Sequence, residues 1–411
     1  MSTSIDRRMF VLGGLGGLAA LARPPGAEVK EAEVKGAEVK AAPARTLVLI
    51  QLTGGHDGLS LLVPYADDGY ARARADTRFD ASKVLRLDER VGLHPELTRL
   101  RALFGAGGLA LIEGVGYPQP NRSHFRSLDI WHAADARGRG TGAGWIGRAL
   151  ERLPELPPHA VVHLGPRPPF SLHSGARAPL CLTPRFLKAG DPESSRALDA
   201  ARALEQDGAG GSETLALVRT RWRDAQVSIA RLSAALQDAE ARPRARVEYP
   251  DTGFARDLET CAALIHAGEG VRVGSLELGG FDTHRDQRGR HARLMAELDG
   301  ALAAFAQDLA ASEAGRETLV LCFSEFGRRV EENASGGTDH GAAGLALALG
   351  PRVKGGFFGV PPALERLDDG DLAFTTDFRR LYATCLEEVF GLDPAAVLGP
   401  GYAPLDFART S

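Results

Sequence analysis

The sequence predicts an α/β fold in which a doubly wound, mostly parallel sheet carries helices on both faces. Short runs rich in Val, Leu and Ile lack the polar alternation of a half-exposed strand. They predict buried parallel strands over 46–52, 108–115, 160–164, 271–278, 318–323 and 345–349. Helical patterns lie between several of these runs, and this alternation is typical of a parallel sheet. A sheet of this kind binds its ligand at the carboxyl ends of its strands.

The N-terminal segment has the features of a twin-arginine signal peptide. Arg7-Arg8 precedes an uncharged, weakly apolar stretch over 9–22, which is shorter than the roughly 20 apolar residues that span a bilayer. Its glycines disfavour the alternative, a soluble N-terminal helix. We therefore predict a signal peptide over 1–22, a low-complexity linker with Ala-Glu-Val-Lys repeats over 23–45, and one α/β domain over 46–411. The leader predicts a periplasmic or secreted protein.

The predicted helices each show one apolar stripe. The clearest stripe lies over 294–309, where leucines and a phenylalanine recur at spacings of three and four above a polar face. Similar patterns cover 215–236 and 380–390. These helices are expected to pack their stripes against the two faces of the sheet.

Composition is that of an ordinary globular protein. The net charge of -4 gives no basic footprint for nucleic acid, and no second apolar stretch is long enough to cross a membrane. The four cysteines lie far apart without metal-binding or redox spacing. Cys261, Cys322 and Cys385 sit in apolar segments, so we expect small buried side chains there and no disulfide framework.

Polar motifs follow the first two predicted strands. In GGHDG (54–58) the glycines allow a tight turn, and Asp57 is either a ligand at the sheet edge or the cap of an Asx-type turn. In NRSHF (121–125), Ser123 falls where a helix N-cap would. The same position suits a nucleophile or a bound anion, and Arg122 could hold a phosphate or sulfate oxygen. The sequence alone favours the cap.

Later strand ends carry residue types that bind metals. Asp282 and His284 can converge on one cation, with a turn closed by the histidine as the alternative. Glu325, buried at the next strand end, needs a cation, either Arg328 or a metal. His340 follows an aspartate that could orient it as a ligand. Because all these residues gather at one edge of one sheet, they predict a functional site.

The remaining histidines in apolar or isolated positions lack such a context. We interpret them as surface or packing residues: His94, His159, His163, His173 and His266.

Five motifs in order carry a family resemblance: GGHDG (54–58), NRSHF (121–125), GFDTH (280–284), SEFGR (324–328) and GTDHG (337–341). Together they resemble the bacterial domain-of-unknown-function family numbered 1501, and the resemblance extends over nearly all of 46–382. Twin-arginine leaders are usual in that family. Its fold is grouped with the alkaline phosphatase superfamily, whose members hydrolyse or transfer phosphate and sulfate esters at one or two metals. The resemblance thus implies an alkaline phosphatase-like fold.

The resemblance also implies roles for single residues. Asp57 corresponds to a ligand of one metal, and Asp282 with His284 to ligands of the other, although the superfamily usually spaces that pair more widely. Glu325 stands in the place of a ligand aspartate, and Phe326 stands where a histidine is expected. One metal and an altered pair of metals therefore both remain open.

The same resemblance makes Ser123 the nucleophile. It lets residues 338–341 match either the Asp-His pair or a later lone histidine ligand, and the strand that follows favours the lone histidine, His340. The first hypothesis is an exported hydrolase of small-molecule or glycan esters of phosphate or sulfate. A divalent metal, zinc first with calcium and manganese as alternatives, would activate Ser123 or a water, and Arg122 or Arg328 would steady the anion. The alternative is a catalytically inactive exported module that binds a carbohydrate, an anion or a partner protein.

Overall fold

A computed structural model describes residues 45–138, 142–175, 177–182, 213–241 and 247–409. The predicted leader and all but the last residue of the predicted linker lie outside them. The centre is a nine-stranded sheet of order β13-β5-β12-β9-β1-β8-β6-β7, with β16 paired to β5. Its strands are β1 (Thr46–Thr53), β5 (Leu109–Gly116), β6 (Val161–Leu164), β7 (Leu180–Leu182), β8 (Val273–Gly279), β9 (Thr318–Phe323), β12 (Gly344–Leu349), β13 (Gly356–Gly359) and β16 (Thr376–Asp377).

The sheet is mostly parallel, as predicted, with one exception. β12 pairs antiparallel with both β5 and β9, so the prediction of a parallel strand over 345–349 is wrong. The reason is the connection: after β9 the chain forms a hairpin, β10 (Arg328–Glu332) with β11 (Thr338–His340), and then enters β12 from the edge where β9 ended. A parallel strand would need a crossover back to the opposite edge.

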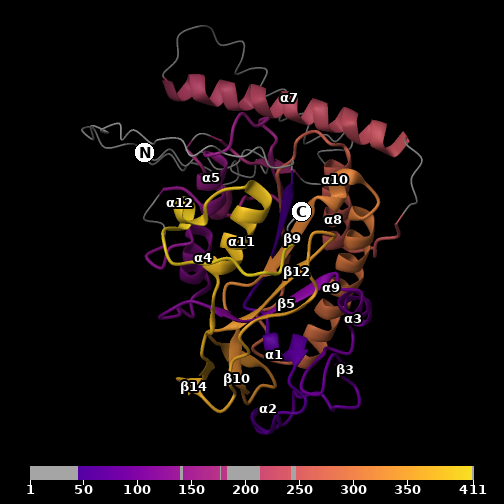
Figure 1. The fold of residues 1–411 in the computed structure, drawn as a ribbon, viewed down its shortest axis with the longest axis vertical. Coiled ribbons are helices and arrows are strands. Elements are labelled where there is room, and N and C mark those ends of the chain that lie inside the picture. Colours follow the sequence, from indigo (N-terminus) through magenta and orange to yellow (C-terminus); the bar gives the residue numbers. More distant parts are fainter. Residues whose placement is uncertain (1–44, 139–141, 176, 183–212, 242–246, 410–411) are drawn as a thin grey trace, which may run out of the picture.

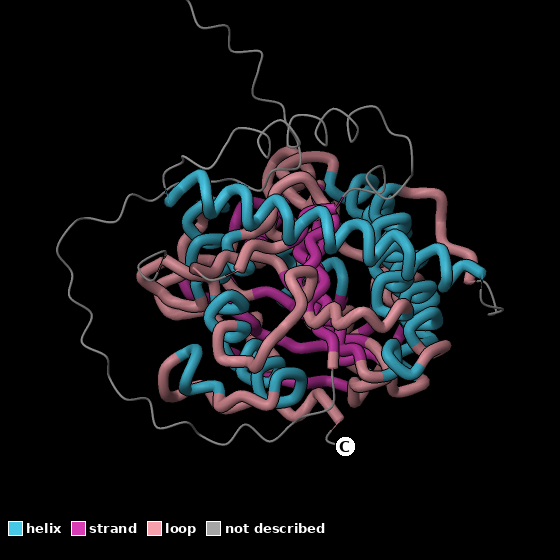
Figure 2. The backbone as a smooth tube through the Cα atoms, turned by 90° about the horizontal axis from the view of Figure 1, so that it is seen from above, coloured by secondary structure: helices cyan, strands magenta, loops and turns pink. Residues whose placement is uncertain are grey.

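Helices cover both faces of the sheet (Figures 1 and 2). One layer holds α3 (Thr98–Gly105), α8 (Gly253–His266), α9 (Gln287–Leu309) and α10 (Glu313–Arg316). The other holds α4 (His124–Ala133), α5 (Trp145–Leu150), α11 (Arg379–Phe390) and α12 (Pro394–Leu398). The long helix α7 (Glu213–Ala241) contacts α8 near the end of the molecule at the top of Figure 1. None of the helices described combines the length and hydrophobicity that a membrane span requires.

Strand β1 shows why the strands lack an alternation of apolar and polar residues. Val48, Ile50 and Leu52 pack beneath α8 and α9, while Leu47 and Leu49 pack beneath α11 on the opposite face. Both sets of side chains are buried, because helices remove both faces of the sheet from water. The predicted apolar stripe of α9 is also buried, through Leu298, Leu302, Phe305 and Leu309.

Three of the four cysteines are small core residues. Cys261, Cys322 and Cys385 are buried in apolar clusters, as predicted, and all four thiols are free.

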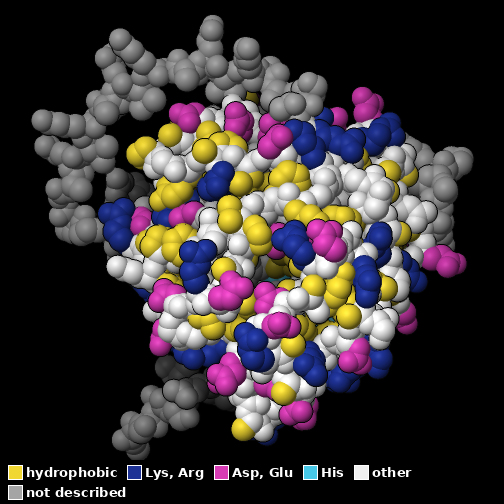
Figure 3. Space-filling model, turned by 60° about the horizontal axis from the view of Figure 1, so that its bottom comes forward, with side chains coloured by type: hydrophobic (Ala, Val, Ile, Leu, Met, Phe, Trp, Pro, Cys, Tyr) yellow, Lys and Arg dark blue, Asp and Glu magenta, His cyan; other side chains and the backbone are white. Residues whose placement is uncertain are grey.

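Short elements surround the carboxyl ends of the parallel strands, at the bottom of Figure 1. They are the helices α1 (Gly58–Leu61) and α2 (Asp68–Ala73), a small sheet of β2 (Leu62–Val63), β4 (Gly92–Leu93) and β3 (Leu85–Arg86), the β10–β11 hairpin, and the hairpin of β14 (Leu367–Asp368) with β15 (Asp371–Leu372). A 3₁₀ turn, Phe170–Leu172, lies elsewhere, between β6 and β7. Figure 3 brings the carboxyl ends of the parallel strands to the front and shows a hollow near the centre of the view, among acidic and basic side chains.

Candidate metal centre

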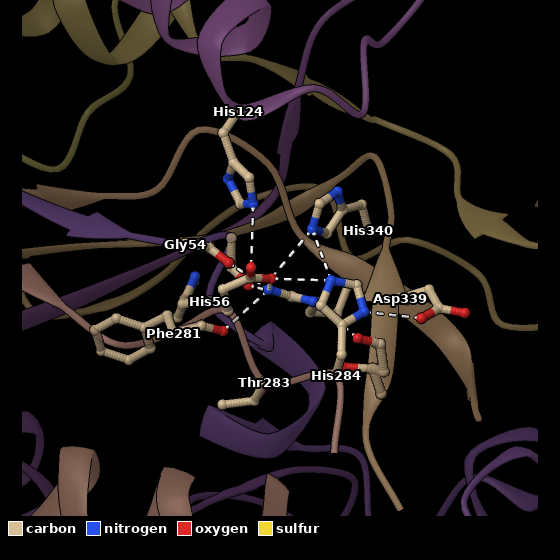
Figure 4. A network of polar contacts seen from close by, with 12 residues as sticks. Gly54, His56, His124, Phe281, Thr283, His284, Asp339 and His340 are labelled. Atoms are coloured by element: carbon tan, nitrogen blue, oxygen red, sulfur yellow. Dashed lines mark hydrogen bonds and ion pairs between the residues drawn. The ribbon is translucent and has the colours of Figure 1, made fainter. Parts of the chain in front are cut away.

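Three histidines and one aspartate meet at the carboxyl edge of the sheet (Figure 4). His124 is the first residue of α4, His340 ends β11, and Asp282 and His284 lie in the loop after β8. This loop packs directly on the loop after β1: a Cβ atom at Gly54, where φ is +119°, would lie 2.4 Å from the backbone nitrogen of Asp282. Only glycine permits that approach.

Asp282 is the centre of the group. Its Oδ1 lies 3.0 Å from Nε2 of His284 and 3.1 Å from Nε2 of His340. Its Oδ2 lies 3.7 Å from Nε2 of His124. Partial burial acts to raise the pKa of Asp282, but the hydrogen bond from Arg328 and its positive charge outweigh burial and lower the pKa to about 2. The carboxylate is therefore ionised at neutral pH.

The other nitrogen of each imidazole is held by an acceptor. Nδ1 of His124 lies 2.7 Å from Oε1 of Glu325, and Nδ1 of His284 lies 2.9 Å from Oδ1 of Asp339. Nδ1 of His340 lies 2.8 Å from the backbone carbonyl oxygen of Arg122. Carbonyl and carboxylate oxygens only accept hydrogen bonds. Each Nδ1 must therefore carry the hydrogen, which leaves the lone pair of each neutral ring on Nε2.

With the rings in their neutral form, three Nε2 lone pairs face one carboxylate. The Nε2 atoms of His284 and His340 are only 3.0 Å apart, and Nε2 of His124 is buried without a hydrogen-bond partner. Lone pairs that face each other and an anion repel unless a cation lies among them. Ligand atoms of His124, Asp282 and His340 lie within 4.8 Å of one another, so these residues fit a metal ion.

Glu325 lies behind His124. Its carboxylate is fully buried and accepts hydrogen bonds from His124 and from the backbone N–H of Gly54 at 3.0 Å. Burial acts to raise the pKa of Glu325, but these bonds hold it below its ordinary value, and the bond to Glu325 raises the pKa of His124. Of the two partners expected for Glu325, Arg328 or a metal, Arg328 pairs instead with Asp282, and the side chain that holds Glu325 is His124.

Asp57 is held in a separate buried cluster. It forms an ion pair with Arg74, with oxygen–nitrogen distances of 2.7 and 3.1 Å, and accepts hydrogen bonds from Ser60 at 2.6 Å and from Gln287 at 2.5 Å. Burial acts to raise the pKa of Asp57, but Arg74 holds it far below its usual range. The structure does not bring Asp57 into the group around Asp282.

The two candidate anion-binding arginines are already engaged. Arg328 is buried and donates to the carbonyl oxygens of Gly54, Gly55, Phe281 and Thr338 and, at 2.7 Å, to Asp282. It therefore ties together the loops that carry the site. Arg122 donates to Asp371 at 2.6 and 2.9 Å and to Asp369 at 3.0 Å, in the β14–β15 hairpin.

Ser123 occupies the N-cap position of α4, as its sequence context predicts. Its hydroxyl makes no capping hydrogen bond, however, and the residue is exposed beside His124. Phe326, at the position where the resemblance leads one to expect a histidine, packs its ring against those of His124 and His340, with centroids 4.8 and 4.9 Å apart. It holds two imidazoles in place.

Sequence reasoning assigned no role to His124, and it led us to expect that Asp339 orients His340. In the structure Asp339 holds His284, and the carbonyl oxygen of Arg122 holds His340. His124 belongs to the NRSHF motif, and its position at the amino end of a helix that follows a strand could have indicated a role in the site. His94, His159 and His163 are buried, in line with a packing role. His56 and His291 are buried too, and both ring nitrogens of each residue lack a hydrogen-bond partner.

The comparisons with known proteins agree with the motifs. A family model described as a protein of unknown function, DUF1501, matches residues 111–399. The chain belongs to this family. No curated protein matches the DUF1501 chain.

Solved structures resemble the DUF1501 chain only distantly. A phosphonate monoester hydrolase from Silicibacter pomeroyi is 11% identical, with 87% of this chain and 77% of that chain covered and a TM-score of 0.40. A putative sulfatase from Bacteroides thetaiotaomicron is 12% identical, with 87% and 75% covered and a TM-score of 0.32. Alkaline phosphatase from the Antarctic bacterium TAB5 is 10% identical, with 74% and 91% covered and a TM-score of 0.29. At these scores we draw no functional conclusion from the likeness.

Proposed function

We propose that this DUF1501 protein is an exported, metal-dependent hydrolase of phosphate or sulfate esters. The observation that carries the proposal is the convergence of three Nδ1-anchored imidazoles on Asp282. Each imidazole has an oxygen acceptor behind it, the arrangement that orients histidine ligands in metal sites. Export to the periplasm rests on the Arg7-Arg8 leader.

His124, Asp282, His284 and His340 would hold the metal. Three imidazole nitrogens with one carboxylate oxygen favour zinc or a neighbouring transition metal, because calcium prefers a shell of oxygens. Bound there, the metal would supply Lewis-acid stabilisation of the ester oxygens and a lowered pKa for an attacking hydroxyl or water.

The chain itself supplies the nucleophile and the positioning groups. The hydroxyl of Ser123 is free of capping and adjacent to His124 in the chain, and we propose it as the attacking group. Glu325 and Asp339 fix the orientation of His124 and His284 through their Nδ1–H groups. Since Arg122 and Arg328 are engaged within the protein, neither is proposed to bind the reacting anion.

Metal content and ester hydrolysis together test the proposal. The purified chain, supplied with zinc, should retain the metal after desalting, and Asp282→Asn should lose it. The matched control is Asp251→Asn, which alters an exposed aspartate paired with Arg256. Ser123→Ala should keep the metal but lose hydrolysis of aryl phosphates and sulfates. A chain that retains no metal would refute the proposal; one that binds metal but cleaves no ester would favour the inactive binding module.

A further inference from the structure

A basic surface follows the candidate metal centre along the chain. Arg285, Arg288, Arg290 and Arg293 come within nine residues of His284, and all four are exposed. Within the described part of the chain, none of them forms an ion pair, and none of their side chains forms a hydrogen bond. The guanidinium of Arg288 lies over the ring of Phe79, 5.6 Å from its centroid. This density of uncompensated cations contrasts with the net charge of -4 of the whole chain.

Three of these arginines line one hollow. Arg288, Arg290 and Arg293 surround a surface hollow of about 390 Å³, whose rim also includes Asp76 and Asp286. Neither aspartate pairs with any of the three arginines in the described residues. The nearby carboxylate of Glu332 is occupied by the backbone N–H groups of Asp76 and Thr77, at 2.8 and 2.7 Å. The hollow therefore keeps a positive excess.

The local structure makes these cations unfavourable for folding. α9 starts at Gln287, so Arg288 and Arg290 lie in its first turn, where the helix dipole already places partial positive charge. The N-cap residue, Asp286, has a left-handed backbone with φ of 48° and makes no capping hydrogen bond, and the first turn holds no acidic residue. The first turn itself therefore supplies no carboxylate to offset this positive charge.

The hollow is linked to the metal centre by one short loop. The side chain of Asn333 donates to the carbonyl oxygen of His284 at 3.0 Å and to Asp339 at 3.1 Å. The backbone N–H of Gln287 donates to the carbonyl oxygen of Gly336, which borders the hollow, at 2.9 Å. Residues 333–336 thus contact both the ligand loop and the start of α9.

We propose that this arginine hollow binds a second phosphate or sulfate group of a substrate whose reacting ester lies at the metal centre. The inference rests on the proposed function and narrows its substrates to multiply charged esters. Guanidinium groups suit this task because each presents a planar fork of donors that matches two oxygens of a tetrahedral anion. Multiply charged esters are then distinguished from singly charged ones by contacts away from the reacting group.

Binding to metal-free protein separates the hollow from the metal centre. The chain is stripped with a chelator and desalted, and binding is measured by calorimetry at low and at physiological salt. The probes are myo-inositol hexasulfate and myo-inositol hexakisphosphate, with myo-inositol as the uncharged reference. We expect the charged probes to bind and the affinity to fall with salt, because exposed charges are screened. The stronger probe identifies whether sulfate or phosphate is preferred.

The test variant is the triple substitution R288Q/R290Q/R293Q. It should weaken binding of the charged probes at least roughly tenfold, since several charge-assisted hydrogen bonds are lost. The control is R223Q/R231Q/R256Q, which removes the same charge from exposed positions on α7 and α8; it should leave binding nearly unchanged. Thermal unfolding of all variants shows whether each one folds.

The outcomes separate this inference from the proposed function. Equal binding by the wild type and the R288Q/R290Q/R293Q variant, or an equal loss in the control, overturns the arginine hollow. Failure to retain zinc overturns the metal centre alone, because the charged probes are measured without metal. Zinc retention by the triple variant is expected to match that of the wild type.

Discussion

We expect Glu325→Gln to weaken zinc binding without removing any atom that touches the metal. The variant keeps a carbonyl oxygen that can accept the Nδ1–H of His124, 2.7 Å away in the wild type, but it loses the negative charge behind the imidazole. Groups of this kind typically contribute 10- to 100-fold to metal affinity, or about 1.4–2.7 kcal/mol.

The structure predicts which of two such substitutions weakens zinc binding more. Glu325 is 0% exposed, whereas Asp339, which holds His284, is 55% exposed. Charges act more strongly where water is excluded, so Glu325→Gln should lie near the upper end of this range and Asp339→Asn near the lower end. Zinc affinity is measured by competition with a chromophoric chelator at fixed pH.

Glu277→Gln is the matched control for charge. Glu277 lies on β8 with an exposed side chain, and it hydrogen-bonds to none of the candidate ligands. We expect its substitution to change zinc affinity less than twofold, roughly the noise of such measurements. If Glu325→Gln binds zinc as tightly as the wild type, or if Glu277→Gln loses as much, the orienting role of Glu325 is refuted.

Further predictions concern activity, pH and stability. Ser123→Ala should abolish ester hydrolysis while zinc affinity stays within twofold, which parallel assays would show; retained hydrolysis would exclude it as nucleophile. Burial lowers the pKa of His56 to about 4 and that of His291 to about 3, so the unfolded chain binds more protons below pH 6.5 and stability falls as pH drops, by about 1.4 kcal/mol per unit for each histidine. His291→Phe should flatten that fall in denaturant titrations from pH 7 to 4.5, and an unchanged slope would contradict the assignment. Arg74→Met should destabilise the fold by about 3–5 kcal/mol, because it leaves Asp57 buried without its partner; a change below 1 kcal/mol in chemical denaturation would show that Asp57 is otherwise compensated.

The sheet could be predicted from local pattern, but the direction of one strand could not. Apolar runs report burial on both faces, and burial is the same for β12 as for its parallel neighbours. Direction depends on which edge the chain enters from, and the β10–β11 hairpin decides that. This connection also delivers His340 to the site edge immediately before β12 begins.

The location of the site could be predicted from the sequence, but most contacts between its side chains could not. The rule that ligands bind at the carboxyl ends of parallel strands indicated Asp282, His284 and His340, and the fold brings these residues together. Asp57 satisfied the same rule, but its partner Arg74 lies at the end of a short helix that no sequence pattern linked to it. Side-chain pairing between separate loops depends on packing, which local patterns do not encode.

The charges at the sheet edge favour a single metal ion. Four of the candidate residues and their partners there are carboxylates, and three of them are engaged within the protein: Asp57 pairs with Arg74, and Glu325 and Asp339 accept the Nδ1–H groups of His124 and His284. Asp282 alone faces several imidazole lone pairs, and it shares its charge with Arg328. A second divalent ion would need anionic ligands of its own, since burying an uncompensated charge is costly. The described residues offer none free beside this group, so zinc titration should saturate at one ion per chain.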